Sequence, residues 1–524
     1  MRQLKIIVSV LALCLCTTTQ AQNSVMQVDT TIVPGVEYLL RNVSSGLFIT
    51  RSGTLVTDPI QADSWRFLSD ESPTMIHSNR IFLFMANGGV TGWRVNLTGE
   101  AKTQEIIKSN DTQGAFKFRC KYMLDTRYLN VQADSTLGFA RTQDTTSDWQ
   151  LVRAPEQNAH LYRLLTVETK SGSTQFTIGY QSVDVQGNPV ELSGFIVLPT
   201  SGKGGMCTAD HILFSTHYTM AKNAQVPSMA DPYDALTFTF SSNKPVMIEP
   251  DYMGYGISFG HPHPYIEPNI MARNCVDMLL ATHQLLREMC GFDVSQGNIP
   301  TYGIGYSQGG STILAVQKYI ETSENISDSL RQVIKYTRTC AAAGPYNPLA
   351  TYSQYLYQDD ISTVCAVPLL ISGMIDAFPE IFDTIRAEDY FSEAFNQADI
   401  LGLMRSGNYN TDEIDLLIKS ACGAKKVSLM LCEEAQDVNS DLSQKLMKAL
   451  GQCNLTRDWV PQAEIRFYHN TRDDVVPYLN TISAYNAFSN NGVSNVTLHT
   501  STIASGHIPA AIEFMARMIL GNYK

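Results

Sequence analysis

The feature that most constrains this chain is a glycine-rich turn between an apolar run and a run of helical character. The turn reads Gly305-Tyr306-Ser307-Gln308-Gly309, with a strand predicted from Ile299 before it and a helix predicted as far as Ile320 after it. Glycines two positions before and after a serine let a strand and a helix approach without a clashing Cβ. Gly-x-Ser-x-Gly also arises by chance, so the strand and helix around it carry the argument. The pattern predicts a nucleophile elbow that exposes the hydroxyl of Ser307 at the top of a sheet.

The start of the chain predicts export. Two basic residues precede the apolar run Ile6 to Cys16, and small polar residues then lead to Ala21. This is the pattern of a cleaved signal peptide over residues 1–21, which predicts a secreted, periplasmic or cell-surface protein. A lipid anchor on Cys14 or Cys16 is the less favoured alternative. No later run approaches the roughly 18 apolar residues of a membrane helix, so no membrane span is predicted.

Length, charge and cysteine content narrow the remaining classes. A chain of 524 residues exceeds what one core usually spans, so two or more domains are expected. The formal net charge of −12 repels polyanions and argues against nucleic acid as a partner. No Cys-x-x-Cys occurs, which disfavours a zinc site or a redox dithiol. Pairing among Cys422, Cys432 and Cys453 is left open.

The first part of the mature chain, residues 28–154, is predicted to be an all-β module. It contains short runs rich in β-branched and aromatic residues, separated by Gly, Asn, Asp and Ser. The run Tyr38–Ile49 has an echo in Tyr122–Val131, and Gln61–Phe67 has one in Thr146–Leu151. A weaker middle copy of the second pair lies at 114–118. Three copies resemble a ricin-B-like β-trefoil.

The resemblance to a β-trefoil implies a fold that is often used to hold glycans, so a glycan is a candidate partner of this module. Trp65, Phe116 and Trp149 are the aromatic residues of the three copies. They could stack on a sugar, but the simpler interpretation places them in the core of a pseudo-threefold barrel.

Strands and helices are predicted to alternate from about residue 160, after a link over residues 158–165. A hairpin is predicted from two strands, Phe176–Asp184 and Val190–Leu198, and short apolar runs follow at 211–215 and 245–249. An amphipathic helix over 274–290 leads to the strand before Ser307, and another strand over 336–343 follows the elbow helix. This alternation predicts a mostly parallel sheet with helices on both faces.

The chain resembles the α/β-hydrolase superfamily, and most closely its secretory-lipase-like branch. The resemblance is carried by Pro250-Asp251-Tyr252-Met253-Gly254-Tyr255-Gly256, by His263-Pro264-Tyr265 and by the elbow itself. It covers about residues 166–345 and 459–524. It implies an α/β-hydrolase core in two parts, residues 160–346 and 460–524.

The segment between the two parts of the core, residues 347–459, is expected to form a helical cap over the carboxyl edge of the sheet, where doubly wound sheets bind ligands. Helices are predicted over Ala366–Ile385, Asp412–Ser420 and Leu442–Leu450. Their apolar faces could line the pocket or close a local helical core.

The resemblance also implies the partners of Ser307. The superfamily places its acid as Asp-x-x-Val-Pro just past a strand, which is predicted here over 463–469; this points to Asp473, with Asp474 as the alternative. His507 precedes a terminal helix predicted from Ile508 and fits the base, whereas His499 lies within a predicted strand. Serine, acid and histidine thus follow the chain order of α/β hydrolases.

The chemistry expected of this set is acyl transfer. His507 would take the proton of Ser307 as its Oγ attacks an acyl carbon, and Asp473 would orient the imidazole. Backbone N–H groups of Gln308 and of Tyr218 would bind the oxyanion; the family usually has His-Gly where this chain has His217-Tyr218. No metal or organic cofactor is required.

The sequence therefore predicts a secreted serine hydrolase that cleaves carboxylic esters, a lipase or esterase, with an acyl ester as substrate. Two alternatives stay open. A serine exopeptidase would use the same triad on an amide, and a glycan-binding surface protein would use the hydrolase body only as a scaffold.

Overall fold

The computed structural model divides into two compact units, one within residues 1–77 and 81–158 and the other within 78–80 and 159–524. It describes residues 28–33, 36–50, 54–62, 64–67, 75–77, 80–82, 85–86, 95–96, 104–122, 125–153, 161–170, 172–200, 207–230, 244–290, 299–358, 361–490, 492–503 and 506–524. The predicted signal peptide and the first part of the predicted link lie outside the described residues.

The described part of the first unit is all-β, as predicted. Strand β14 (Trp149–Arg153) pairs with β2 (Glu37–Asn42), which pairs in turn with β5 (Ser64–Phe67). A meander of β11 (Phe116–Tyr122), β12 (Asp125–Val131) and β13 (Leu137–Ala140) joins the same sheet through the contact of β11 with β14. The β-trefoil arrangement stays a prediction.

The aromatic residues of the repeated segments lie in the core of the first unit. Trp65 and Trp149 are fully buried, and Phe116 lies opposite Trp149 in the neighbouring strand. The indole N–H of Trp149 donates to the carbonyl of Leu129 at 3.1 Å. These side chains are therefore core residues and not platforms for a sugar.

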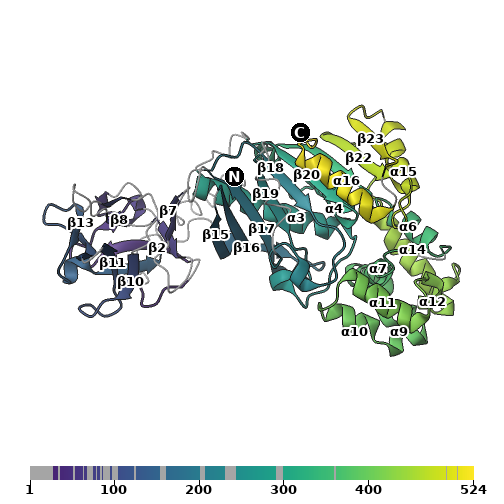
Figure 1. The fold of residues 1–524 in the computed structure, drawn as a ribbon, viewed down its shortest axis with the longest axis horizontal. Coiled ribbons are helices and arrows are strands. Elements are labelled where there is room, and N and C mark those ends of the chain that lie inside the picture. The colour runs from purple at the N-terminus through teal and green to yellow at the C-terminus, as the bar shows by residue number, and fades with distance from the viewer. Residues whose placement is uncertain are drawn as a thin grey trace, which may run out of the picture. The chain divides into compact units, whose positions relative to one another are not determined.

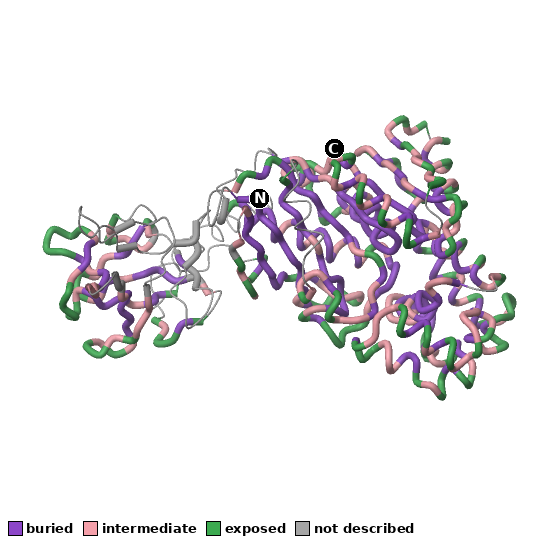
Figure 2. The backbone as a smooth tube through the Cα atoms, viewed as in Figure 1, coloured by how far each residue is buried: buried purple, intermediate pink, exposed green. Residues whose placement is uncertain are grey.

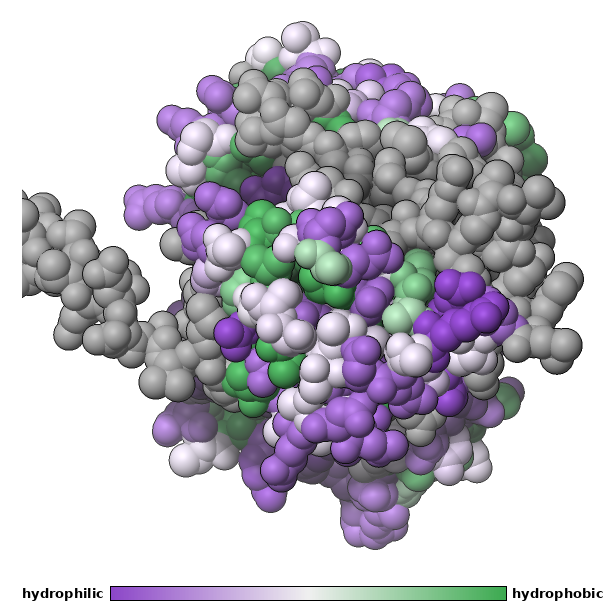
Figure 3. Space-filling view, turned by 90° about the vertical axis from the view of Figure 1, so that its left-hand side faces the viewer, coloured by the Kyte–Doolittle hydropathy of each residue, from purple (hydrophilic) through white to green (hydrophobic). Residues whose placement is uncertain are grey.

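Over the coloured part of the face in Figure 3, hydrophilic side chains are interspersed with small hydrophobic groups.

The described strands of the second unit form one mixed sheet of nine strands (Figure 1). The first four strands of its spatial order are joined by antiparallel pairs, and every later pair is parallel. In spatial order the strands are β15 (Tyr162–Lys170), β16 (Ser173–Val183), β17 (Pro189–Pro199), β19 (Val246–Pro250), β18 (Ile212–Thr216), β20 (Thr301–Tyr306), β21 (Tyr336–Ala342), β22 (Glu464–Asn470) and β23 (Val496–Ser501).

One boundary prediction was wrong. The link expected over 158–165 overlaps β15, which begins at Tyr162 and pairs with β16 along its length. Tyr162, Leu164 and Val167 belong to a run that alternates apolar and polar residues only in part, and this weakened the strand signal.

Helices cover both faces of this sheet. Successive residues of a strand point to opposite faces, so neighbouring residues of β20 contact different helices. A Cβ on Gly303 of β20 would contact Ile313 of α4 (Gln308–Thr322), whereas Ile304 packs in a cluster with Phe514 of α16 (His507–Ile519). α3 (Pro268–Cys290) packs against α4, and α15 (Tyr478–Asn490) packs against β22 and β23. α5 (Asp328–Ile334) precedes β21.

The segment between β21 and β22 is helical, and its apolar residues form a core that also includes Ala221, Tyr265 and Ile266. Figure 2 shows buried residues among these helices. One of the predicted helices is broken: the run expected over Ala366–Ile385 stops at Ala377, because Phe378 leaves the helical conformation before Pro379. The helices are α6 (Pro348–Tyr355), α7 (Ala366–Ala377), α8 (Pro379–Phe382), α9 (Glu393–Gln397), α10 (Ile400–Arg405), α11 (Thr411–Cys422), α12 (Val427–Met430), α13 (Glu433–Gln436) and α14 (Asp441–Gln452).

Cys422, Cys432 and Cys453 are all free, so the pairing left open by the sequence is not formed. Cys432 instead accepts a hydrogen bond from the backbone of Ala435 at the start of α13. Within the described ranges, the longest helices are too short or too polar to cross a bilayer.

Candidate active site

Ser307 lies at the sharp turn between β20 and α4. Its φ of 58° and ψ of −124° place a non-glycine residue in a sparsely populated region of backbone conformation. A Cβ on Gly309 would overlap the carbonyl oxygen of Thr216, and a Cβ on Gly305 would overlap the carbonyl oxygen of Gly309. The two glycines thus let strand and helix approach, which is the geometry that the Gly-x-Ser-x-Gly pattern predicts.

His507 and Asp473 meet although they come from different elements. Nδ1 of His507, the first residue of α16, lies 2.7 Å from Oδ2 of Asp473, in the loop after β22. The backbone N–H groups of Val475 and Val476 donate to Oδ1 of Asp473 at 2.9 and 2.8 Å. The acceptor holds Nδ1 protonated and leaves Nε2 of His507 with a free lone pair, ready to accept a proton.

The carboxylate of Asp473 is strongly favoured in its charged form. Its side chain is fully buried, and burial alone would raise its pKa. Hydrogen bonds from His469 and His507 overcome this effect and hold the pKa well below its ordinary value. Asp473 is thus ionised at neutral pH and can stabilise a positive charge on an adjacent imidazole.

Asp474, the alternative acid, contacts the backbone of His507 and not its ring. Its Oδ1 accepts the backbone N–H of His507 at 2.7 Å, at the first turn of α16. Its Oδ2 accepts a hydrogen bond from Ser362 of the helical segment. Of the two carboxylates, only Asp473 is placed to orient the imidazole. His499 lies apart on β23, where its ring contacts Tyr468.

Two residues at this site were missed by sequence reasoning. The hydroxyl of Tyr306 donates to the carbonyl of His507 at 2.6 Å, and the two rings are 4.9 Å apart. His469, the penultimate residue of β22, places Nε2 3.1 Å from Oδ2 of Asp473. Tyr306 occupies the first variable position of Gly-x-Ser-x-Gly and His469 closes a strand, and neither position carries a signal of its own in one sequence.

Gln308 follows the nucleophile position and begins α4, so its backbone N–H has no acceptor within the helix. Its side-chain amide donates to Nε2 of His263 at 3.0 Å, while Nδ1 of His263 donates to the carbonyl of Met253 at 2.8 Å. This arrangement requires a neutral imidazole, and burial lowers the pKa of His263 to about 3. Gln308 is thereby fixed at the start of the helix.

The loop of His217, Tyr218 and Thr219 forms the opposite wall of the site. It is held by the tyrosine-rich segment singled out in the sequence: Tyr252 donates to the carbonyl of His217 at 3.0 Å, and Tyr255 donates to the carbonyl of Met220 at 2.6 Å. The His217 ring also lies 3.9 Å from that of Tyr252. The backbone of this loop is therefore well fixed, whereas the Tyr218 side chain is 55% exposed.

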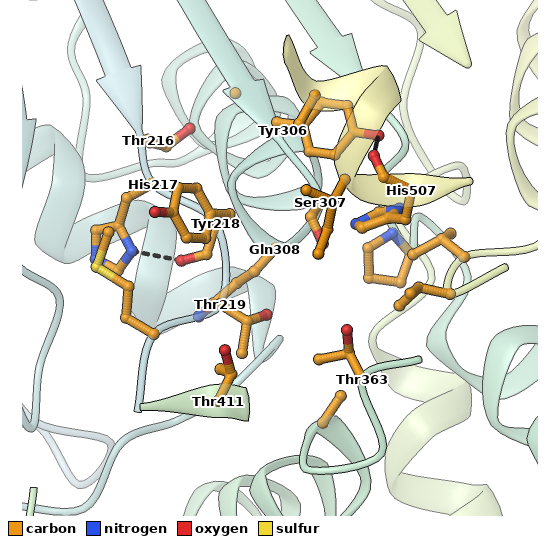
Figure 4. Close-up of a pocket in the computed structure, with 18 of the residues that line it drawn as sticks. Thr216, His217, Tyr218, Thr219, Tyr306, Ser307, Gln308, Thr363, Thr411 and His507 are labelled. Atoms are coloured by element: carbon orange, nitrogen blue, oxygen red, sulfur yellow. Dashed lines mark hydrogen bonds between the residues drawn. The ribbon is translucent and has the colours of Figure 1, made fainter. Parts of the chain in front are cut away.

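A cavity of about 840 Å³ is lined by Ser307, Gln308, His507 and the loop of His217, Tyr218 and Thr219. In Figure 4, Ser307 and His507 lie side by side, and the His217 loop lies across from them. Apolar residues of α16, among them Ile508, Ile512 and Met515, line part of the wall. Threonines of the helical segment, Thr363 and Thr411, line another part. In the part of the chain that the structure describes, no group of His, Cys, Asp and Glu side chains is arranged to hold a metal ion.

The arrangement of the sheet is shared with known hydrolases. The chain is 19% identical to the rice cell wall degrading esterase LipA from Xanthomonas oryzae, with a TM-score of 0.56 over 68% of this chain and 96% of that one. It is 18% identical to a putative hydrolase from Legionella pneumophila, with a TM-score of 0.54 over 68% of this chain and 90% of that one. The second unit has the α/β-hydrolase fold. The predicted fold class is confirmed for this unit.

A sequence family described as secretory lipase matches residues 420–519. The matched stretch contains Asp473 and His507, while Ser307 lies before it. No curated protein matches the chain.

Proposed function

We propose that this chain is an exported serine hydrolase that cleaves carboxylic esters through Ser307, His507 and Asp473. The observation that carries the proposal is the contact of the ionised Asp473 with His507, which lines the same cavity as the strained Ser307. The match of residues 420–519 to a secretory lipase family supports both ester chemistry and export. The signal-peptide pattern over residues 1–21 supports export independently.

The mechanism follows from the protonation states. His507 donates through Nδ1 to Asp473, so Nε2 acts as the base that removes the proton of Ser307. The Oγ of Ser307 attacks the ester carbonyl, and His507 returns the proton to the leaving alcohol. Water then attacks the acyl-enzyme by the same route in reverse. The Asp473 carboxylate stabilises the imidazolium formed in each step.

The oxyanion would be bound by the backbone N–H of Gln308 and by that of Tyr218. Each such donor is worth roughly 3 kcal/mol of transition-state stabilisation. The contacts of Gln308 with His263 and of His217 with Tyr252 support this assignment, because preorganised donors need no reorganisation during the reaction.

The wall of the cavity favours esters of apolar acids. Ile508, Ile512 and Met515 present an apolar surface next to His507. An acyl chain bound there would remove this apolar surface from water, which is favourable. Ile508 and Ile512 are 61% and 70% exposed, so this surface gains from being covered.

The experiment that tests the function compares substrates and a covalent probe. The full-length protein should hydrolyse p-nitrophenyl esters of graded acyl length, and a fluorophosphonate probe should label it. Hydrolysis of aminoacyl amides with little action on esters would show the exopeptidase alternative. If the protein shows no turnover and no labelling, it is a binding protein with an inactive hydrolase body.

A further inference from the structure

The carboxylate of Asp473 contacts two imidazoles and not one. Its Oδ2 lies 2.7 Å from Nδ1 of His507 and 3.1 Å from Nε2 of His469. The side chain of His469 is fully buried, as is that of Asp473. A triad needs only one of these two histidines, so the second requires an explanation.

The hydrogen bonds around His469 show which ring nitrogen faces Asp473. The Asp473 carboxylate is ionised and can only accept, so Nε2 of His469 carries a proton. The carbonyl of Val476, 3.0 Å from Nε2, also accepts. Nδ1 lies 2.6 Å from the hydroxyl of Thr481, a fully buried residue of α15. His469 therefore directs an N–H from Nε2 to Asp473, and both of its ring nitrogens have a hydrogen-bond partner.

We propose that His469 is a positioning residue of the triad, which holds Asp473 in the plane of His507 and, by sharing Oδ2, limits how basic His507 becomes. This inference rests on the proposed serine hydrolase function. A carboxylate oxygen that already accepts one N–H offers less negative charge to a second donor. His469 thus keeps the imidazolium of His507 from being over-stabilised, so that His507 can still give its proton to the leaving alcohol.

The surroundings of the pair contain few competing charges. Tyr306 of β20 and Tyr355 of α6 are tyrosines whose pKa values burial raises, so they stay neutral. Tyr478, at the start of α15, packs edge-on against the His469 ring at 5.5 Å. Asp474 is exposed and contacts the backbone of His507.

Two substitutions separate a hydrogen-bonding role from a packing role. His469→Phe keeps a ring against Tyr478 and removes the N–H, whereas His469→Gln keeps an N–H donor near the position of Nε2. The readout is the pH profile of kcat/KM for a soluble ester, with thermal unfolding as the test of folding. His499→Gln is the matched control, since His499 lies apart from Asp473 on β23.

For His469→Phe we expect the acid limb of kcat/KM to move to higher pH by about 0.5 unit or more, because His507 alone then uses Oδ2. We also expect the plateau to fall roughly tenfold, because Asp473 loses one of its fixed donors. His469→Gln should keep both the limb and the plateau near those of the wild type, as should His499→Gln. An unchanged limb and plateau in a folded His469→Phe protein, or equal losses in the Gln and Phe variants, would overturn the proposal.

Two further measurements cover the remaining cases. If His469→Phe does not fold, Thr481→Val removes the hydroxyl that contacts Nδ1 and should move the acid limb in the same direction by a smaller amount; no movement would contradict the proposal. A proton NMR spectrum tests the role of His469 separately from the proposed function, because the measurement needs no turnover. The Nδ1 proton of His507 should move further downfield in His469→Phe, and an unchanged signal would overturn the proposal even in an active hydrolase.

Discussion

The hydroxyl of Tyr306 donates to the backbone carbonyl of His507 at 2.6 Å, so the residue before Ser307 fixes the first residue of α16. Tyr306 and Ser307 are consecutive, and both line the cavity. The Tyr306 ring also packs against that of Phe514 of α16, with 5.9 Å between the ring centroids. One side chain of the turn thus contacts the backbone of His507 directly.

Tyr306→Phe should lower kcat about tenfold and leave KM nearly unchanged. The substitution removes the hydroxyl and leaves a buried carbonyl without its donor, which costs about 1–3 kcal/mol and loosens the start of α16. Steady-state kinetics on a soluble ester measures the effect, with Tyr478→Phe as a control tyrosine whose hydroxyl contacts Thr500 away from the triad. Equal kinetics in the wild type and Tyr306→Phe would contradict this role.

Asp473→Asn and Asp474→Asn should differ by orders of magnitude. An amide at 473 can present an N–H to His507 and favour the wrong tautomer, so kcat should fall about 10⁴-fold. An amide at 474 keeps an oxygen that accepts the backbone N–H of His507, so kcat should stay within about tenfold of the wild type. Turnover numbers of the two purified variants decide this. The reverse order would transfer the role of the acid to Asp474.

Gly309→Ala should abolish activity and destabilise the second unit. A Cβ at this position would overlap the backbone carbonyl of Thr216, which cannot move without shifting β18. Gly451→Ala is the matched control, because a Cβ there meets only Leu349 at 3.9 Å and alanine favours the helix by about 0.5–1 kcal/mol. Urea denaturation should show a large loss for the first variant and none for the second. Similar midpoints for both would mean that the elbow is not tightly packed.

The sequence predicts those candidate residues that a local pattern marks. Ser307 is marked by its glycines, and Asp473 is marked by the Val-Val-Pro that follows it. The hairpin before β18 is marked by its turn residues. Each of these patterns spans only a few consecutive residues, so a single sequence is enough to recognise it.

The contacts that the sequence did not predict depend on packing between distant elements. Tyr306 acts through α16, about 200 residues later in the chain, and His469 acts through α15 and the following loop. β18 lies between β19 and β20 in the sheet, so the order in the sheet differs from the order in the chain. No local sequence pattern predicts this crossover. The sequence favoured Asp473 over Asp474 only through its place in Asp-x-x-Val-Pro; which carboxylate contacts the His507 ring depends on how the loop turns each side chain.

The most direct measurement is the turnover of a soluble ester by Ser307→Ala beside the wild type, with mass spectrometry of the fluorophosphonate adduct on the wild type. The account predicts that Ser307→Ala unfolds at the temperature of the wild type, that its kcat/KM is at least about a thousandfold lower, and that the adduct lies on Ser307. Esterase activity of Ser307→Ala within tenfold of the wild type, or an adduct on another residue, would contradict it.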